Sequence, residues 1–478
     1  MPVPNWRFHG IFTKHYYTIY TMCRTVAVGL IAFLTFWWIA CTDTEPPSVA
    51  ITSPENGARI SDTTLIVVEV QENKKVYYVE IYIDGTLADR CYTEPYTFLW
   101  APDSLEHWSV HEICAAAVDV AENSAESEPI TVTVVHPGLL KWQLELQDIT
   151  ACPAIGDDGT IYVVTGETLY DYSYLHAINP DGTYKWHCQL YSEGSIPVIG
   201  PEGTIYVSAR APNLQPYLAA ISPTGGPLWE IEVAIYGGPA IGIDGAIYTG
   251  QQDGLHVYGP DGTLRWSYAL PARAYSPAIA SGGTVYIGCY DGYVYALNPD
   301  ATLKWSYPLE LQTSIAIGGD GSIYCGAHDY LYALRQDGTL KWQYYTEYGT
   351  MDPVIGFGDL VYTSAQGGGG RVHIALDANG VLVWYGSQVS FNGAVAVAED
   401  STVYCVSDEL YALSTNHEIK WVCDDVNDAI HPLTVSKDGT IYVVSDHRLY
   451  AVSGSAPLAN TPWPKVRHDI ANSGRKGY

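Results

Sequence analysis

Signals for helix are scarce in this chain, and so is positive charge. Its 478 residues include only three Met, and 23 Lys and Arg stand against 52 Asp and Glu, which gives a formal net charge of −29. Such an acidic surface repels nucleic acid and anionic lipid, so we expect no nucleic-acid partner. Outside the N-terminus, no long apolar run has the 3.6-residue period of a helix, which predicts an all-β fold.

The usual sequence signals of catalysis and metal binding are also missing. The ten cysteines include no CxxC spacing and no adjacent pair, and the 14 histidines form no HExxH. No GxSxG, phosphate-binding loop or EF-hand spacing occurs. The densest acidic cluster, Asp424–Asp428, is interpreted as a solvated loop, with a calcium site as the alternative. We therefore predict no catalytic residue, no metal ligand and no cofactor.

The N-terminus carries the one long apolar segment, which predicts export. It runs from Thr25 to Ala40 behind Arg24, too short for a membrane span and suited to the apolar region of a secretory signal. Trp38-Ile39-Ala40-Cys41 resembles a bacterial lipobox. We expect residues 1–40 to be a signal peptide, with Met22 as an alternative start, and Cys41 to be lipidated. An uncleaved signal anchor is the alternative. Residues 41–47 form a short polar tether.

Residues 48–136 have the pattern of a small β-sandwich. Six or so short runs of alternating apolar and polar residues fall within about 90 residues, as in the immunoglobulin fold. The stretches Val79–Gly85, Pro95–Trp100 and Ala115–Ala125 resemble bacterial Ig-like modules. Cys91 and Cys114 are the only cysteines of this stretch, so we hypothesise a disulfide between them.

Residues 137–478 consist of copies of one unit that holds short strands separated by tight turns. An aliphatic residue followed by Tyr recurs every 38 to 44 residues, a spacing that suits four short antiparallel strands per unit. These tyrosines are Tyr162, Tyr206, Tyr248, Tyr286, Tyr324, Tyr362, Tyr404 and Tyr442. A Trp closes each unit, at Trp186, Trp229, Trp266, Trp305, Trp342, Trp384 and Trp421. Eight units predict an eight-bladed β-propeller, and each Trp is interpreted as structural, packed between neighbouring blades.

The repeats also resemble a known family. Pro153–Val163 (PAIGDDGTIYV), Tyr330–Trp342 (YLYALRQDGTLKW) and Pro462–Arg475 (PWPKVRHDIANSGR) are similar to the pyrroloquinoline-quinone-type (PQQ-like) propeller repeat. The resemblance covers the chain from about Leu139 onward. Quinone-dependent dehydrogenases of this architecture carry a vicinal Cys-Cys pair and Glu, Asn and Asp calcium ligands. This chain has no such Cys pair, so the resemblance implies the fold without the quinone.

Several positions within the repeats need interpretation. The Asp-Gly pairs fall in phase with the strands and are hairpin turns in this interpretation. His176, His256 and His373 are placed at one repeat position, where Tyr is otherwise common. One more Trp is available than blades need, so either the strand around Trp142 or the segment around Trp463 closes the ring.

The loops between second and third strands differ more than the strands. They are expanded at Thr165–Ser173, Ala209–Pro216 and Ser364–Arg371 and tight elsewhere. Because equivalent loops emerge on one face, these insertions indicate a binding surface, with neutral drift as the alternative. The first loop carries Tyr170, Tyr172 and Tyr174 as candidate binding residues.

These features predict a lipid-anchored, extracytoplasmic scaffold and not an enzyme. The family resemblance implies a relationship to PQQ-like propeller lipoproteins that act as assembly factors at the outer membrane. We expect a monomer that binds a protein or glycan partner in the bacterial cell envelope or at the cell surface. The alternatives are a secreted quinoprotein-type oxidoreductase and a carbohydrate-active or carbohydrate-binding surface protein.

Overall fold

The computed structural model describes most of the chain beyond the predicted signal peptide. The described residues are 44–61, 63–102, 109–146, 148–167, 172–190, 195–210, 215–347, 349–367, 370–386, 395–407, 409–427, 429, 433–465, 467–469 and 472–474. Cys41 and Tyr170 lie outside them, as does the side chain of Tyr172. Apart from two short stretches of the sandwich, contacts divide the chain into one compact unit up to Thr133 and another from Val134 on.

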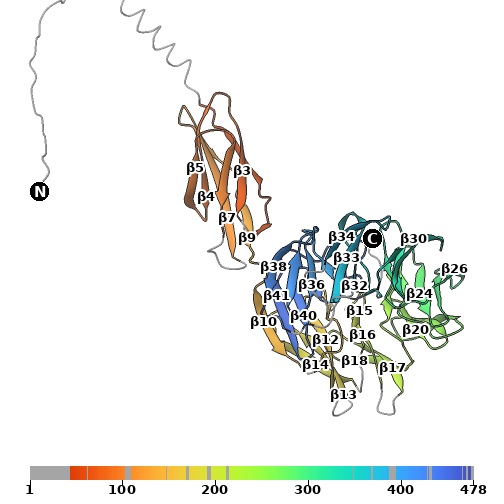
Figure 1. The fold of residues 1–478 in the computed structure, drawn as a ribbon. Helices are drawn as coiled ribbons and strands as arrows, with labels where there is room; N and C mark the ends of the chain where they lie inside the picture. Colours follow the sequence, from red (N-terminus) through yellow and green to blue (C-terminus); the bar gives the residue numbers. More distant parts are fainter. Residues whose placement is uncertain are drawn as a thin grey trace, which may run out of the picture. The chain divides into compact units, whose positions relative to one another are not determined.

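The first unit is an Ig-like sandwich of two antiparallel sheets (Figure 1). One sheet has the order β1-β3-β6, and the other has the order β2-β9-β7-β4-β5, with β8 paired to β7. Alternate residues such as Ile81, Ile113 and Ala115 are buried between the sheets, as expected for strands with one solvated face. The strands are β1 (Ser48–Ser53), β2 (Ala58–Ile60), β3 (Thr64–Gln71), β4 (Val76–Ile83), β5 (Thr86–Cys91), β6 (Tyr96–Trp100), β7 (Val110–Asp119), β8 (Ser124–Glu126) and β9 (Ile130–Val134).

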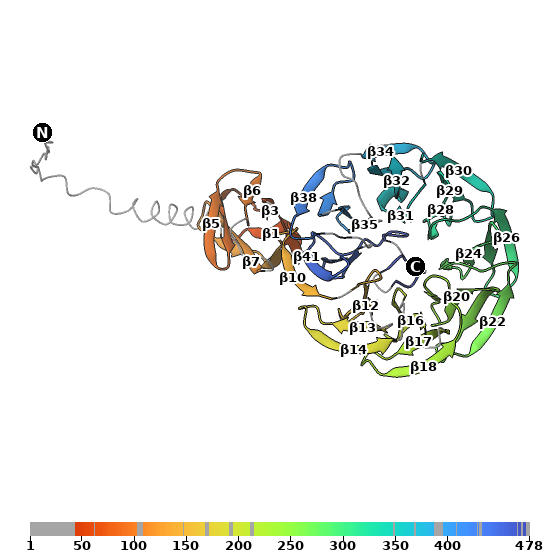
Figure 2. The same cartoon turned by 60° about the horizontal axis from the view of Figure 1, so that its bottom comes forward.

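The second unit is a propeller, in which the described residues form eight four-stranded antiparallel sheets. Figure 2 shows these sheets arranged as blades around a ring. Blades 1 to 7 each use four consecutive strands, from the innermost first strand to the outermost fourth. The predicted all-β fold, an Ig-like sandwich followed by a propeller, is confirmed.

Blades 1 to 4 contain strands β11 to β26. Their bounds are β11 (Ala154–Ile155), β12 (Ile161–Glu167), β13 (Tyr172–Ile178), β14 (Tyr184–Leu190), β15 (Val198–Ile199), β16 (Ile205–Arg210), β17 (Pro216–Ile221), β18 (Pro227–Glu232), β19 (Ala240–Ile241), β20 (Ile247–Gln251), β21 (Gly254–Tyr258), β22 (Leu264–Ala269), β23 (Ala278–Ile279), β24 (Val285–Cys289), β25 (Tyr293–Leu297) and β26 (Leu303–Pro308).

Blades 5 to 8 contain the remaining strands and one 3-10 turn, η1 (Phe357–Asp359). Their bounds are β27 (Ala316–Ile317), β28 (Ile323–Ala327), β29 (Tyr330–Leu334), β30 (Leu340–Tyr345), β31 (Val354–Ile355), β32 (Val361–Gly367), β33 (Gly370–Leu376), β34 (Leu382–Gly386), β35 (Ala396–Val397), β36 (Val403–Val406), β37 (Leu410–Leu413), β38 (Ile419–Cys423), β39 (Thr434–Val435), β40 (Thr440–Val444) and β41 (Arg448–Ser453).

The N-terminal strand of the propeller closes the ring. Blade 8 has the order β10-β41-β40-β39, so β10 (Leu140–Glu145) supplies its outermost strand. Trp142 on β10 pairs with Ala451, as the Trp of every other blade pairs with an Ala or Val of its third strand. Of the two closing segments considered, the structure therefore selects the one around Trp142.

One row of residues crosses each blade in the same register. In blade 1 the row is Ala154, Tyr162, Ala177 and Trp186, one residue from each strand. The small side chain of the third strand lets the Tyr and Trp rings meet across it, with centroids 5.8 Å apart in this blade. This row explains why Tyr and Trp repeat in phase along the sequence.

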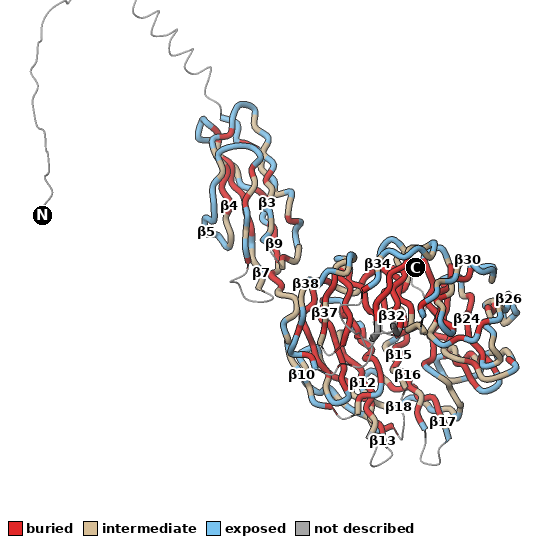
Figure 3. The backbone as a smooth tube through the Cα atoms, in the orientation of Figure 1, coloured by how far each residue is buried: buried red, intermediate tan, exposed pale blue. Residues whose placement is uncertain are grey.

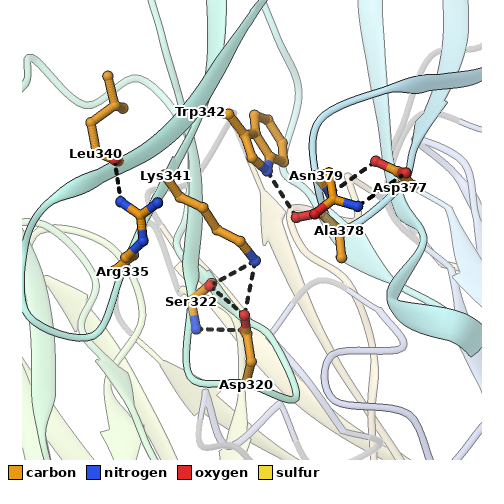
Figure 4. Close-up of polar contacts among 9 residues, drawn as sticks. All are labelled: Asp320, Ser322, Arg335, Leu340, Lys341, Trp342, Asp377, Ala378 and Asn379. Carbon is orange, nitrogen blue, oxygen red and sulfur yellow. Dashed lines mark hydrogen bonds and ion pairs between the residues drawn. The ribbon is translucent and has the colours of Figure 1, made fainter.

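In most blades the Trp of the row also reaches the neighbouring blade. Trp342 Nε1 donates a hydrogen bond of 3.0 Å to the Ala378 carbonyl in the turn between β33 and β34 (Figure 4). The Gly of that turn, Gly380, lies so close that an added Cβ would be 2.6 Å from the Trp342 ring. In the same close-up, Lys341 pairs with Asp320 of its own blade at 2.8 Å. Strands in the middle of the blades are buried (Figure 3), so these contacts join rigid sheets.

Candidate binding face and central channel

The turns between second and third strands lie on one face of the ring, which we call the hairpin face. The connections that lead from one blade to the next lie there too, because each joins the end of a fourth strand to the start of the next first strand, and several make an isolated bridge to the end of the following second strand. Examples are Ala274 with Cys289 and Thr350 with Ala365. The hairpin face therefore combines two sets of loops, from the blades and from between them.

The expanded hairpins of blades 1, 2 and 6 belong to this face. Strands β12 and β13 have seven residues each, against five for β28 and β29 of blade 5. Of the three candidate tyrosines, the structure places the side chain of Tyr174, which is half-buried on β13. Its ring centroid lies 6.0 Å from that of His176 and 5.9 Å from that of His187. Whether the three tyrosines act together stays a prediction.

The histidine alignment needs one correction. Ala375 pairs with Trp384 as Ala177 pairs with Trp186, which places His373 two residues before the row and His176 one residue before it. A shift of one residue in a strand moves a side chain to the other face of the sheet. His373 is fully buried, and burial together with the nearby His417 lowers its pKa to about 3. His176 and His256 do share one position.

The predicted disulfide of the sandwich is not present in the structure, where both cysteines are free. Cys91 on β5 pairs with Val79, and Cys114 on β7 pairs with Tyr82, so β4 lies between them. Two strand spacings amount to about 10 Å, beyond the roughly 7 Å limit for the Cα atoms of a disulfide. Val79 and Tyr82 also face opposite sides of β4.

The Asp-Gly pairs form turns, as their phase with the strands indicated. Asp337 Oδ1, for example, accepts hydrogen bonds from the backbone N–H and the hydroxyl of Thr339, at 2.9 and 2.7 Å. In the Asp-Gly turns between first and second strands, a Lys of the fourth strand can reach the Asp carboxylate and stabilise its charge further. Burial opposes the charge on Asp158, but hydrogen bonds from Lys185 and Thr160 lower its pKa to about 2. Among the described residues no group of three His, Cys, Asp or Glu side chains could hold a metal ion.

The described residues between 456 and 474 lie along the axis of the ring, and we call them the channel segment (Figure 2). The N–H groups of four first strands donate to carbonyls of this segment: Ile241 to Ser473, Ile279 to Gly474, Ile355 to Trp463 and Val397 to Pro464. Because first strands are the innermost ones, only a central segment can reach so many of them. The channel segment thereby pairs the inner edges of the blades.

Buried polar side chains anchor the channel segment. Asn472 donates to the carbonyls of Pro153 and Pro197, at 3.3 and 3.2 Å, and accepts a hydrogen bond of 2.7 Å from Lys465 Nζ. Burial lowers the pKa of Lys465, which is inaccessible to solvent. Arg467 donates to the carbonyl of Pro239. These contacts reach blades 1, 2 and 3, so the segment holds together blades that precede it by 228 to 319 positions of sequence.

A cavity of about 590 Å³ opens on the hairpin face beside the channel. Arg273 lies in its wall, with its Cζ 3.7 Å from the ring centroid of Tyr290 and 4.9 Å from that of Tyr236. Tyr275 packs against Tyr290 with ring centroids 5.3 Å apart. Polar side chains complete the wall, and they are Ser276, Glu310, Gln312, Thr313, Ser314 and Asp352.

Sequence reasoning missed this cavity because its residues come from the connections between blades. Those connections lie outside the repeated strands and turns, so no periodic signal marks them. The available signal was compositional, since Ala272-Arg273-Ala274-Tyr275 places a cation and an aromatic residue in a connection of a chain poor in cations.

Two family models match the chain, one for each unit. Residues 47–115 match the bacterial Ig domain, and residues 215–374 match the model described as outer membrane protein assembly factor BamB. The chain joins a bacterial Ig domain to a PQQ-like propeller. Its described residues contain no helix long and apolar enough to cross a membrane.

Solved structures agree with the propeller fold. BamB from Moraxella catarrhalis superposes with a TM-score of 0.53 at 16% identity, over 66% of this chain and 97% of that chain. The Dos1 propeller superposes with a TM-score of 0.51 at 11% identity, over 65% and 93%. At these identities the likeness shows the fold alone. No curated protein matches the chain.

Proposed function

We propose that this protein is a non-catalytic scaffold of the bacterial cell envelope, anchored by lipid on Cys41, that captures protein partners on the hairpin face of its propeller. The observation that carries the proposal is the match of residues 215–374 to the model of an outer membrane protein assembly factor. The geometry supports it, because eight similar sheets form a rigid support for loops that differ from blade to blade.

The filled channel also supports binding over catalysis. The axis of the ring holds buried backbone and side chains of the channel segment, including Lys465 and Asn472. Catalysis would need convergent titratable groups in one cleft, with pKa values tuned by their surroundings. The buried groups here are engaged in holding the segment: the Asp469 carboxylate accepts hydrogen bonds from both the backbone N–H and the hydroxyl of Ser473.

Site-specific photo-crosslinking in the native envelope tests the proposal. A photoreactive amino acid replaces Tyr290 on the hairpin face or, as a matched control, Tyr184, which begins the fourth strand of blade 1; these side chains are 56% and 51% exposed. We expect discrete protein adducts from position 290 and few from position 184. Equal adducts from both positions would contradict a role for this face.

The candidate loop is tested separately. Replacing Tyr170, Tyr172 and Tyr174 together by Ala should weaken partner capture and leave the melting temperature nearly unchanged, since aromatic anchors contribute much of the binding energy of interfaces. Unaltered capture would remove this loop from the proposed surface. Turnover of alcohols or sugars with added quinone and calcium would overturn the non-catalytic scaffold itself.

A further inference from the structure

Arg273 lies in a connection between two blades and has no acidic partner among the described residues. Several cations on the fourth strands are paired with carboxylates, as Lys185 is with Asp158 and Lys341 with Asp320, both at 2.8 Å. Within the described part of the chain, Arg273 makes no ion pair, and its Nε is buried without a hydrogen-bond partner. In a chain with a net charge of −29, an unpaired guanidinium is a distinct local feature.

The surroundings of Arg273 hold its guanidinium in place. Tyr290 and Tyr236 lie over the guanidinium, at 3.7 and 4.9 Å from their ring centroids, and such stacking is favourable for a planar cation. Stacking occupies the faces of the group and leaves its N–H edge to make hydrogen bonds. That edge matches the two oxygens of a planar carboxylate, which Arg binds in a bidentate manner.

The rest of the cavity wall accepts hydrogen bonds. One carboxylate oxygen of Asp352 accepts from the backbone N–H of Ser314, and the other makes no hydrogen bond to a described residue. Glu310 is exposed and lies 3.4 Å from His328 Nε2. With the amide of Gln312 beside them, these groups suit a ligand rich in hydroxyl donors. A ligand with carboxylates alone would be repelled by Asp352 and Glu310.

Tyr290 provides the apolar part of the site. Its side chain is 56% exposed although one face covers Arg273, so a second surface remains for a ligand. A pyranose ring presents apolar C–H groups on its face and hydroxyls at its edge. The face can pack against the aromatic ring of Tyr290 while the hydroxyls donate to the neighbouring acceptors of the cavity wall. A cavity of about 590 Å³ is within the range of small-molecule sites.

We propose that this cavity binds a saccharide that carries a carboxylate, a uronic acid, with the carboxylate on Arg273, the hydroxyls on Asp352, Gln312 and Glu310, and the ring against Tyr290. The inference does not depend on the assembly role proposed above, which uses the wider hairpin face and protein partners.

Calorimetric titration of the purified protein with trigalacturonic acid tests the inference. The comparison ligands are the neutral galactose trisaccharide and an N-acetylated alanine tripeptide with a free carboxylate. The variants are Arg273→Gln, Arg273→Lys and a matched control, Arg448→Gln, which removes an Arg of β41 that pairs with Glu145 at 3.4 Å. Melting curves of each variant report whether it is folded.

We expect trigalacturonic acid to bind and Arg273→Gln to weaken its binding about tenfold or more, since a charge-assisted bidentate contact is lost. Arg273→Lys keeps the positive charge but lacks the bidentate geometry of a guanidinium, so it should lose less affinity than Arg273→Gln. Arg448→Gln should bind like the wild type. Absence of binding at millimolar trigalacturonic acid, or unchanged binding by Arg273→Gln, would overturn the inference. Equal affinity for the neutral trisaccharide would refute the role of the carboxylate, and tighter binding of the tripeptide would assign the cavity to peptide carboxylates instead.

Discussion

At the scale of single residues, the contact between a Trp and the turn of the next blade explains much of the sequence. Trp305 Nε1 donates to the Gln336 carbonyl at 2.9 Å, and Gly338 of that turn lies under the indole ring. The turn glycine has to be small for this contact and also has a positive φ of 86°. Trp and Asp-Gly therefore repeat together because they form one contact between neighbouring blades.

Replacement of Gly338 by Ala should be more destabilising than replacement of Gly292, although both have φ of 86°. An added Cβ would lie 2.6 Å from Cδ2 of Trp305 at position 338 and would meet nothing within 4 Å at position 292. We expect about 1 kcal/mol of destabilisation from the backbone strain alone in Gly292→Ala. Gly338→Ala adds overpacking and should cost about 2–4 kcal/mol. Urea unfolding measures both, and equal losses would refute the contact.

The buried His373 should make stability depend on pH. Its folded-state pKa is about 3, below the ordinary value of 6.5, so between these values the unfolded chain binds more protons. Stability is therefore fully present above pH 6.5 and is lost as pH falls toward 3, by up to about 1.4 kcal/mol per pH unit. His176, with a pKa lowered to about 4 by burial, acts in the same direction.

His373→Leu introduces the residue found at the matching position of blade 5, Leu331. This variant should lose less stability than the wild type between pH 6.5 and 4.5, as measured by urea unfolding. The matched control is His328→Asn, which changes an exposed histidine at a positive φ of 51° that Asn tolerates. A pH dependence that is the same in His373→Leu and the wild type would contradict the prediction.

At the scale of strands and segments, the structure separates what repeats from what does not. Tyr162, Trp186 and their equivalents could be predicted because alternation and turn residues recur in phase. The segment that closes the ring could not be predicted from the sequence, because Trp142 and Trp463 are both flanked by the expected residues. Only the pairing of Trp142 with Ala451 distinguishes them. The channel segment has no strand period, so its place on the axis was not predictable. Arg273 lies in a connection and was missed for the same reason.

The closing strand β10 is testable with two neighbouring residues. Leu144 pairs with Leu449 and packs against a buried cluster that includes Ile155 and Tyr442, whereas Gln143 is exposed. Leu144→Asp places an unpaired charge against that cluster and should destabilise the propeller by about 2–4 kcal/mol. Gln143→Asp should change stability by less than about 0.5 kcal/mol. Thermal and urea unfolding measure the stability of both variants. An equal loss of stability in Leu144→Asp and Gln143→Asp would mean that another segment closes blade 8.

At the scale of the whole molecule, the proposed lipid anchor on Cys41 would determine where the propeller acts. The chain from Cys41 carries 20 basic against 52 acidic residues, so its charge would not attract it to an anionic membrane surface. In the proposed scaffold, membrane attachment depends on the lipid, to which each buried methylene contributes about 0.8 kcal/mol.

Metabolic labelling with an alkynyl fatty acid should therefore mark the wild-type protein and not Cys41→Ser. The variant should also appear in the soluble extracytoplasmic fraction, provided that the signal is still cleaved. Cys91→Ser is the matched control, because it removes a free thiol of the sandwich and should leave labelling intact. Label that persists in Cys41→Ser would rule out this anchor.

The two ends of the propeller also determine when the protein can finish folding. Arg448 meets Glu145 across 303 positions of sequence, and Asn472 meets Pro153 across 319. Blades 1 to 7 each form from consecutive strands, whereas blade 8 and the axis need both ends of the chain at once. Contacts of such high sequence separation form late and slowly. If it is exported as proposed, the chain cannot close its ring until β41 has left the export channel, and a prematurely terminated chain lacks the segment that holds the inner edges of the blades.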